Sequence, residues 1–304
     1  MKTNIYLVPY GGLGNQLFQC AAALAFSKDQ SVSVLCNWGF ARKNKNMELE
    51  MQSFQWSNNV IFKDLPRLST FSKRILNLLL RLGAENKKRI LLILLEWLGS
   101  LYFSVILRKL MFVYINRGLG FDGRRNRSNS LLIGYFQCTN YVSKVKKEML
   151  KIHPKDMSAK TINLINQLKD KEVLVIHVRR GDYLNESFGV LEDSYYEKAI
   201  YEIEYERFEE IWVFSDDLEI AKQMSIFKKS RSVKFVDDND LSSAETLEIM
   251  RHGSGFIIAN SSFSWWAAQL RYKPEAQVLS PTPWFKLIES PNQIIDTNWK
   301  LVQW

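Results

Sequence analysis

Short apolar runs recur along the C-terminal half of the chain, and each is followed by small or polar residues and then by a helical pattern. Continuous apolar runs are typical of strands in a parallel sheet, because crossover helices cover both faces of such a sheet. The pattern therefore predicts four strand–helix units. Their strands are expected at residues 173–178, 211–215, 233–236 and 255–260.

The N-terminal half begins with a unit of the same kind. A strand is expected at residues 4–10, a glycine-rich turn at 11–16 and an alanine-rich helix at 17–29, with a second strand at 32–36. Alternation of strands and helices indicates an α/β protein with parallel sheets.

The length of 304 residues favours two domains, because a typical domain has about 150 residues. A break is expected near Pro154–Ser158, where the stretch HPKDMS separates two helical patterns. We therefore expect an N-terminal domain over 1–156, with a helical basic insertion, and a C-terminal domain over 157–304.

Composition places the chain among globular proteins, since 46% of its residues are hydrophobic and 24% are charged. The three cysteines have no CxxC spacing, which argues against a disulfide framework and against a thiolate zinc site. The first residues also lack the long apolar run of a signal peptide. A reduced, cytoplasmic protein is expected.

The net charge of +9 resides in one segment, residues 73–127, which has twelve Lys or Arg and three acidic residues. The remainder of the chain is neutral, so a general nucleic-acid-binding surface is not expected. The longest charge-free apolar run in the segment, 97–107, is about half of what a membrane span needs. Two interpretations remain: helices packed in the first domain with basic outer faces, or peripheral contact with an anionic membrane.

The glycine-rich turn lies where a strand passes into a helix. Gly12 and Gly14 allow a ligand to approach the backbone, the helix N-terminus favours anions, and the amide of Asn15 can bind a phosphate or sugar oxygen. The spacing is not GxGxxG, so a nicotinamide cofactor is not indicated. A purely structural turn is the alternative.

The strongest motif follows the strand at 173–178 and contains His177, Arg179, Arg180 and Asp182. Planar guanidinium groups bind two phosphate oxygens at once, and cations at a partly desolvated strand end require an anionic partner. The alternative is that both arginines pair only with Asp182 and neighbouring acids. His177 alone is compatible with a hydrogen-bonded core residue.

Two further polar clusters follow predicted strands. Ser215 and Asp216 lie after one strand, and Ser261, Ser262 and Phe263 open a helix after another. Hydroxyl groups and free backbone N–H groups at a helix start bind anions, although ordinary N-capping explains the serines equally well.

A metal site is not expected. Asp238 and Asp240 match the DxD spacing of some metal-dependent nucleotide-sugar enzymes, but they precede a capping box at Ser242 and Glu245, where acids favour the helix dipole. The sequence has no HExxH, P-loop or GxSxG motif, which argues against zincins, P-loop NTPases and common serine hydrolases.

Four motifs in this order, at 11–19, 177–183, 214–217 and 260–268, resemble those of the bacterial alpha-1,2-fucosyltransferases of glycosyltransferase family 11. The resemblance implies two Rossmann-like domains facing a cleft, the B-type glycosyltransferase fold. It also implies inverting, metal-independent transfer of L-fucose from GDP-fucose to the 2-hydroxyl of a terminal galactose in an O-antigen or similar glycan.

The resemblance also implies roles for individual residues. Arg179, Asp182 and His177 are expected to be the catalytic residues. Arg179 would bind the GDP pyrophosphate with support from Arg180, while His177 and Asp182 shape that site. The remaining residues expected at the donor are Gly12, Gly14, Asn15, Ser215, Asp216, Ser261, Ser262 and Phe263.

The base that accepts the acceptor's proton stays open between Asp182, Glu186 and water. Three other functions also stay open: a metal-dependent DxD glycosyltransferase, a nucleotide-sugar-binding protein without catalysis, and a nucleic-acid-binding protein that uses residues 73–127.

Overall fold

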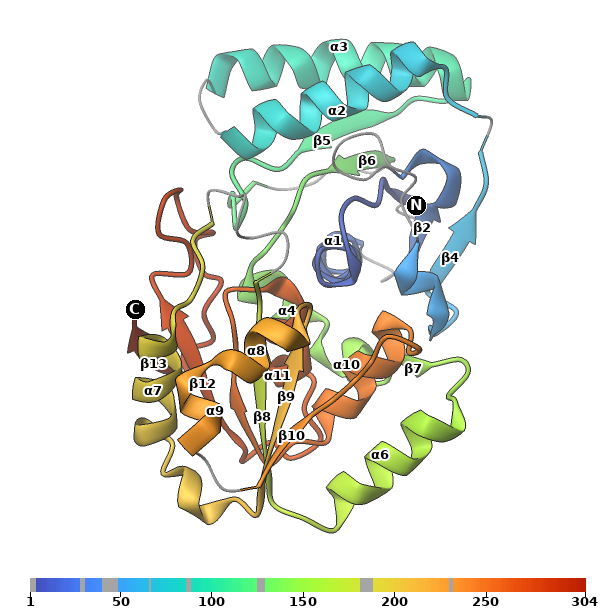
Figure 1. Ribbon diagram of the computed structural model, residues 1–304. Coiled ribbons are helices and arrows are strands. Elements are labelled where there is room, and N and C mark those ends of the chain that lie inside the picture. The colour runs from blue at the N-terminus through green and yellow to red at the C-terminus, as the bar shows by residue number, and fades with distance from the viewer. Residues whose placement is uncertain are drawn as a thin grey trace. The chain divides into compact units, whose positions relative to one another are not determined.

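The computed structural model describes residues 4–27, 31–39, 49–65, 67–85, 89–124, 129–180, 188–229 and 232–304. The chain forms two compact units (Figure 1). Unit 1 comprises Met1–Ile152 and Pro291–Ile294, and unit 2 comprises His153–Ser290 and Ile295–Trp304. The return of 291–294 to unit 1 was not predicted. It is held there by Gln293, whose carbonyl accepts hydrogen bonds from the backbone N–H and the hydroxyl of Thr139, at 2.9 and 2.8 Å.

Unit 1 contains a parallel five-stranded sheet in the order β4-β2-β1-β6-β5. The predicted strands at 4–10 and 32–36 are confirmed as β1 and β2, whereas the other three had not been predicted. The strands of unit 1 are β1 (Ile5–Leu7), β2 (Val32–Leu35), the short β3 (Phe54–Gln55), β4 (Val60–Lys63), β5 (Phe112–Ile115) and β6 (Ser130–Ile133).

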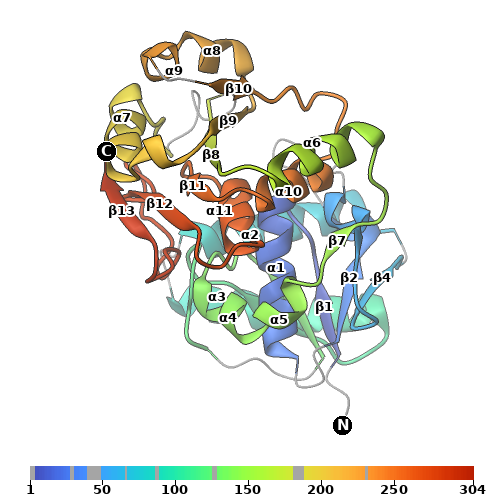
Figure 2. The ribbon, with the colours of Figure 1, turned by 90° about the horizontal axis from the view of Figure 1, so that it is seen from below.

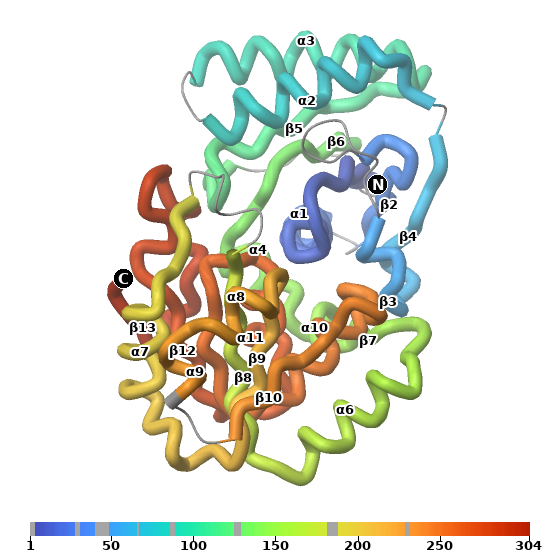
Figure 3. Tube along the Cα trace, in the orientation of Figure 1, coloured from blue at the N-terminus to red at the C-terminus, as the bar shows by residue number. Residues whose placement is uncertain are grey.

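Helices cover both faces of this sheet. The predicted alanine-rich helix is confirmed as α1, and its small side chains allow it to be buried along most of its length. On the other face, α2 and α3 lie beside β5 and β6 (Figures 1 and 3). The helices are α1 (Leu13–Phe26), α2 (Thr70–Glu85), α3 (Arg89–Leu107), α4 (Thr139–Lys144) and α5 (Lys146–Met149), with short 3-10 turns η1 (Cys36–Trp38) and η3 (Glu50–Ser53).

Helix α3 covers the open edge of the sheet at β5. Phe112 and Asn116 donate their backbone N–H groups toward β6, so the N–H groups of the alternating residues point away from the sheet. Each of these donates to a polar side chain of α3. The three pairs are Met111 to Ser104, Val113 to Ser100 and Ile115 to Glu96, each at 2.9 Å. An edge that would otherwise expose unpaired donors is thus closed by side chains.

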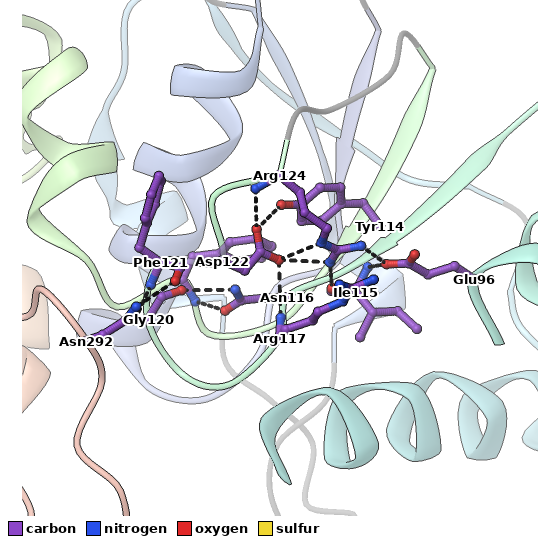
Figure 4. Close-up of polar contacts among 11 residues, drawn as sticks. Glu96, Tyr114, Ile115, Asn116, Arg117, Gly120, Phe121, Asp122, Arg124 and Asn292 are labelled. Carbon is purple, nitrogen blue, oxygen red and sulfur yellow. Dashed lines mark hydrogen bonds and ion pairs between the residues drawn. The ribbon is translucent and has the colours of Figure 1, made fainter. Parts of the chain in front are cut away.

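A partly buried ion-pair network fixes α3 in this position (Figure 4). The guanidinium of Arg124 binds Glu96 at 2.7 Å and Asp122 at 2.8 Å, and lies 4.4 Å from the ring centroid of Tyr114. The Tyr114 hydroxyl donates to Asp122 at 2.5 Å. Arg124 therefore does not contribute to a basic outer face, although it belongs to the basic segment, because its charge is neutralised inside unit 1.

Unit 2 contains a parallel six-stranded sheet in the order β10-β9-β8-β11-β12-β13. All four strands predicted for this half are confirmed as β8 to β11, and β8 has the predicted bounds. Strands β12 and β13 had not been predicted. The strands are β7 (His153–Pro154), β8 (Val173–Val178), β9 (Glu210–Ser215), β10 (Val233–Phe235), β11 (Gly255–Ile257), β12 (Gln277–Thr282) and β13 (Lys300–Gln303).

The helices of unit 2 form two groups, one on each face of the sheet (Figure 2). Alternate residues of β8, such as Ile176, pack in the core with α7, while His177 faces the α11 side and contacts Phe263. The helices are α6 (Ala159–Lys169), α7 (Asp193–Glu202), α8 (Leu218–Gln223), α9 (Ser225–Lys229), α10 (Ser243–Arg251) and α11 (Ser262–Gln269), with the 3-10 turn η5 (Tyr205–Arg207).

The predicted capping box is present and joins two helix starts. Ser242 caps α10, and the Glu245 carboxylate accepts the backbone N–H of Ser242 at 3.0 Å. Its other oxygen accepts the N–H of Ser158, at the start of α6, at 2.7 Å, and the hydroxyl of Thr161 at 2.9 Å. Burial raises the pKa of Glu245, but the hydrogen bonds to the charged carboxylate outweigh it and lower the pKa from 4.5 to about 2.

We expect Glu245→Gln to destabilise the protein by about 1–3 kcal/mol at neutral pH, because one carboxylate oxygen and its charge-assisted bonds are lost. Since the folded-state pKa is depressed, this stabilisation is complete above pH 4.5 and decreases as the pH falls toward 2. Urea unfolding of the wild type and of Glu245→Gln between neutral pH and pH 2 measures this. The difference in their free energies of unfolding should become smaller in acid, and the variant Glu206→Gln, at an exposed position, is the control. A difference independent of pH would contradict the assignment.

Candidate functional site

The register of unit 2 brings the predicted polar clusters to one edge of its sheet. Strand β8 lies between β9 and β11, with Val178 paired to Ser215 and Ile176 paired to Ile257. The residues that follow the three strands therefore lie at neighbouring strand ends. Ligands of open α/β sheets bind beyond such carboxyl ends, so this edge is the candidate functional site.

Asp216 organises the loop after β8. One carboxylate oxygen lies 3.2 Å from Nε of Arg179, and the other accepts the backbone N–H of Arg180 at 2.9 Å. A contact at Nε fixes the plane of the guanidinium group. The structure thus gives Asp216, predicted as a donor-binding residue, a role in positioning Arg179.

Arg180 is more deeply buried than Arg179. Its Nη2 lies 3.5 Å from the carboxylate of Asp193, at the start of α7. Its Nε is buried and has no hydrogen-bond partner among the described residues. Among the described residues, Arg179 therefore pairs with Asp216 and Arg180 with Asp193, in line with the structural alternative, and Arg180 also has a buried donor that is available to another acceptor. Asp182 and Glu186 lie outside the described residues.

His177 is buried at the end of β8 beside Phe263, with ring centroids 6.0 Å apart. Burial and the positive charge of Arg179 lower its pKa to about 3. Its Nδ1 is buried without a partner in the described part of the chain. His177 is therefore neutral near pH 7, which suits packing or hydrogen bonding at this edge better than proton transfer.

The serines of the site form local bonds. Ser261 caps α11 by accepting the backbone N–H of Phe263 at 3.3 Å, as the capping alternative predicts. The hydroxyl of Ser215 donates to the carbonyl of Asp217 and accepts its N–H, both at 3.0 Å, which closes the turn after β9. Ser262 is half-buried at the first position of α11.

The glycine-rich turn of unit 1 differs from the prediction in one respect. A carboxylate already occupies the start of α1, because Glu50 accepts the backbone N–H of Leu13 at 2.5 Å. Glycine is required at position 11, where φ is +75° and a Cβ atom would lie 2.7 Å from the side chain of Asn15. Gly12 caps α1 without a side chain. The motif analysis had no signal for Glu50, which lies far along the chain.

Asn15 is oriented by a residue that the motifs did not reveal. Its Oδ1 accepts a hydrogen bond from Nε2 of Gln137 at 2.7 Å. The glutamines that follow are structural: Gln16 links Gly11 to the backbone of η3, and Gln19 binds both backbone groups of Tyr10.

The DxD carboxylates do not form a cluster. Asp238 accepts a hydrogen bond from the hydroxyl of Thr246 at 3.1 Å, while the side chain of Asp240 is exposed, 3.9 Å from Lys160. Within the described ranges, no group of three or more His, Cys, Asp or Glu residues could hold a metal ion.

Comparison with known proteins gives consistent matches. The family Glycosyl transferase family 11 matches residues 4–303. An alpha-1,2-colitosyltransferase of Escherichia coli is 26% identical over 91% of this chain and 90% of its own length. The O-antigen biosynthesis glycosyltransferase WbnK of the same species is 28% identical over 90% of this chain and 93% of its own length.

A solved structure supports the fold. The NodZ alpha-1,6-fucosyltransferase, from crystals soaked with GDP-fucose, aligns with a TM-score of 0.50 at 10% identity over 96% of this chain and all of that one. This likeness confirms the predicted α/β architecture of B-type glycosyltransferases with two Rossmann-like domains. Since the family match extends over nearly all of its sequence, the protein belongs to glycosyl transferase family 11.

Proposed function

We propose that this glycosyltransferase transfers L-fucose from GDP-fucose, with inversion, to the 2-hydroxyl of a terminal galactose in an O-antigen or similar glycan. The observation that carries the proposal is the meeting of Arg179, Arg180 and the start of α11 at neighbouring strand ends. Such an arrangement suits a diphosphate, because two forked cations and a helix start supply several donors to adjacent oxygens.

The chemistry explains why the cations lie there. The bond between the sugar's anomeric carbon and the phosphate oxygen breaks through an oxocarbenium-like state, and negative charge grows on the departing GDP. Donors already fixed at that charge lower the barrier. Arg179, held at Nε by Asp216, is the positioned donor, and the buried Nε of Arg180 supports it.

The acceptor oxygen attacks the face of the sugar opposite to the departing diphosphate, and its proton leaves to a base. Asp182, Glu186 or water remain the candidates for that base. His177 is not among them, because an imidazole with a pKa of about 3 is too weak a base to take the hydroxyl proton efficiently near neutral pH.

A second donor is favoured by one of the relatives. One of the two Escherichia coli relatives is named an alpha-1,2-colitosyltransferase. Colitose is L-fucose without its 3-hydroxyl. A GDP-colitose donor would carry the same GDP leaving group as GDP-fucose, so the arginines would serve both donors. Discrimination would come from groups that bind the 3-hydroxyl.

The reaction is proposed to occur in the cytoplasm, at the inner face of the membrane. The relative WbnK is named for O-antigen biosynthesis, which supports a surface glycan as the acceptor.

The donor and acceptor can be tested together by measuring GDP release. We expect turnover with GDP-fucose and a β-galactoside, and none when the acceptor is the matched 2-deoxygalactoside. GDP-colitose should react slower by about 10²-fold or more if the 3-hydroxyl is bound by polar groups. Faster turnover with GDP-colitose than with GDP-fucose would replace GDP-fucose as the proposed donor but leave the proposed diphosphate site unchanged. Binding of GDP-fucose without transfer to any galactoside would indicate a non-catalytic protein.

Arg179→Lys should fold normally and lose about 10²–10³-fold in transfer rate, because lysine keeps the charge but not the planar fork. Arg180→Lys is expected to lose less, since this residue has a supporting position. Initial rates at saturating GDP-fucose, with thermal unfolding of each variant, separate a catalytic loss from a damaged fold. Near wild-type turnover of folded Arg179→Lys would exclude the diphosphate contact.

Activity should survive exhaustive treatment with EDTA, because the proposed partners of the diphosphate are arginines and a helix start. Initial rates before and after chelation measure this. Loss of activity with rescue by Mn²⁺ or Mg²⁺ would indicate that Asp238 and Asp240 bind a metal ion that the reaction needs. The double variant Asp238→Asn and Asp240→Asn should then abolish the rescue.

A further inference from the structure

Helix α3 presents its apolar side chains to the outside of unit 1. Ile90, Leu94, Trp97, Leu101 and Val105 recur at intervals of three and four residues, which places them along one stripe of the helix. Ile90, Trp97 and Val105 are 83%, 59% and 78% exposed, and the other two are about half exposed. The stripe is continuous over the length of the helix.

Apart from the exposed Arg89 at its start, the polar side chains of α3 face the sheet instead. Glu96, Ser100 and Ser104 are spaced by four residues and bind the edge of β5 as described above. Leu92 and Phe103 of α3 are also buried, so the helix has apolar residues on both its inner and its outer side. A helix on the surface of a soluble protein normally has polar residues on the outer side. The apolar stripe is therefore not a packing surface of unit 1, and its contiguous exposure indicates an external partner.

By length and composition alone, α3 could cross a membrane, which the charge-free run at 97–107 did not predict. Only 17% of its most apolar 18-residue stretch is buried. A helix that crossed the membrane would have to leave β5. This departure would break the ion pair between Glu96 and Arg124 and expose three backbone N–H donors. The packing of α3 therefore favours a helix that lies flat at an apolar surface.

Helix α2 extends the apolar surface. Phe71 is 64% exposed, and its ring lies 6.3 Å from that of Tyr102 in α3. Leu78 lies on the same stripe of α2 as Phe71, interleaved with Arg74 and Arg81. We call the outer stripes of the two helices the α2–α3 face.

Exposed cations lie along α2 and at both ends of α3. The Lys and Arg residues described on α2, on α3 and just after α3 are all exposed, whereas Glu96 points inward and Glu85 pairs with Arg81 at 3.1 Å. The exposed cations are Lys73, Arg74, Arg81, Arg89, Arg108 and Lys109. Lys87 and Lys88 lie outside the described residues.

We propose that the α2–α3 face docks on an anionic lipid surface, with α3 lying in the plane of the headgroups. Apolar side chains enter the interface while the flanking cations meet lipid phosphates. A second copy of the chain fits less well, since it would bring two sets of cations together. The inference is independent of the proposed donor and acceptor, because none of the site residues lies on this face.

Flotation of the full chain with vesicles tests the proposal. We expect binding to vesicles in which a third of the phosphatidylcholine is replaced by phosphatidylglycerol, weak binding to phosphatidylcholine alone, and release by salt. Trp97→Glu and the double variant Lys73→Glu, Arg74→Glu should each reduce binding at least about tenfold. The matched control is Leu287→Glu in unit 2, where the leucine is 71% exposed, and it should bind normally.

Four results would overturn docking. The first is equal, salt-insensitive binding to both vesicle types, and the second is unchanged vesicle binding by the variants of the α2–α3 face. The third is no vesicle binding together with a dimer, seen by sedimentation velocity, that Trp97→Glu dissociates. The fourth is resistance of the bound protein to carbonate extraction, which would indicate a membrane-spanning helix. If Trp97→Glu does not fold, the double charge variant decides, since both side chains are exposed. GDP release with a soluble acceptor should be unchanged in the variants, which separates failure of docking from failure of the proposed transfer reaction.

Discussion

The parallel register of β8 with its two neighbours determines where chemistry can occur in unit 2. Because β8 is paired with β9 and β11, three loops that are distant in sequence begin side by side. Parallel pairing also buries these strands on both faces, which leaves their ends as the places where charged groups can be held. Arg179, Asp216 and Ser261 occupy those ends.

Several motif residues at this site form contacts within the protein that hold the site's geometry. Asp216 positions Arg179, Ser261 caps α11, and the hydroxyl of Ser215 closes a turn. These contacts within the protein fix the geometry of neighbouring groups at the strand ends. Arg180 is different, since its buried Nε has no partner among the residues described.

Much of the fold follows from local sequence pattern, and the remainder does not for identifiable reasons. The strand at 173–178 was predicted to the residue because it is a continuous apolar run ending at charged residues. Strand β12 was missed because Ser280 and Pro281 interrupt its apolar pattern. Glu50 and Gln137 could not be found, because each acts through a contact across more than thirty residues of chain. The apolar composition of α3 was evident, but its orientation depends on donors of β5 that only tertiary structure reveals.

That orientation has a consequence for mutational tolerance. On the side of α3 that faces β5, small size and polarity are required, because a larger or apolar residue at Ser100 would leave a backbone donor of the sheet edge without an acceptor. On the outer side, the most exposed side chains of the stripe, Ile90 and Val105, contact little of the protein, so apolar residues there contribute little to the free energy of folding. Packing within unit 1 therefore explains little of the apolar character at these positions, whereas the proposed contact with a lipid surface would use it.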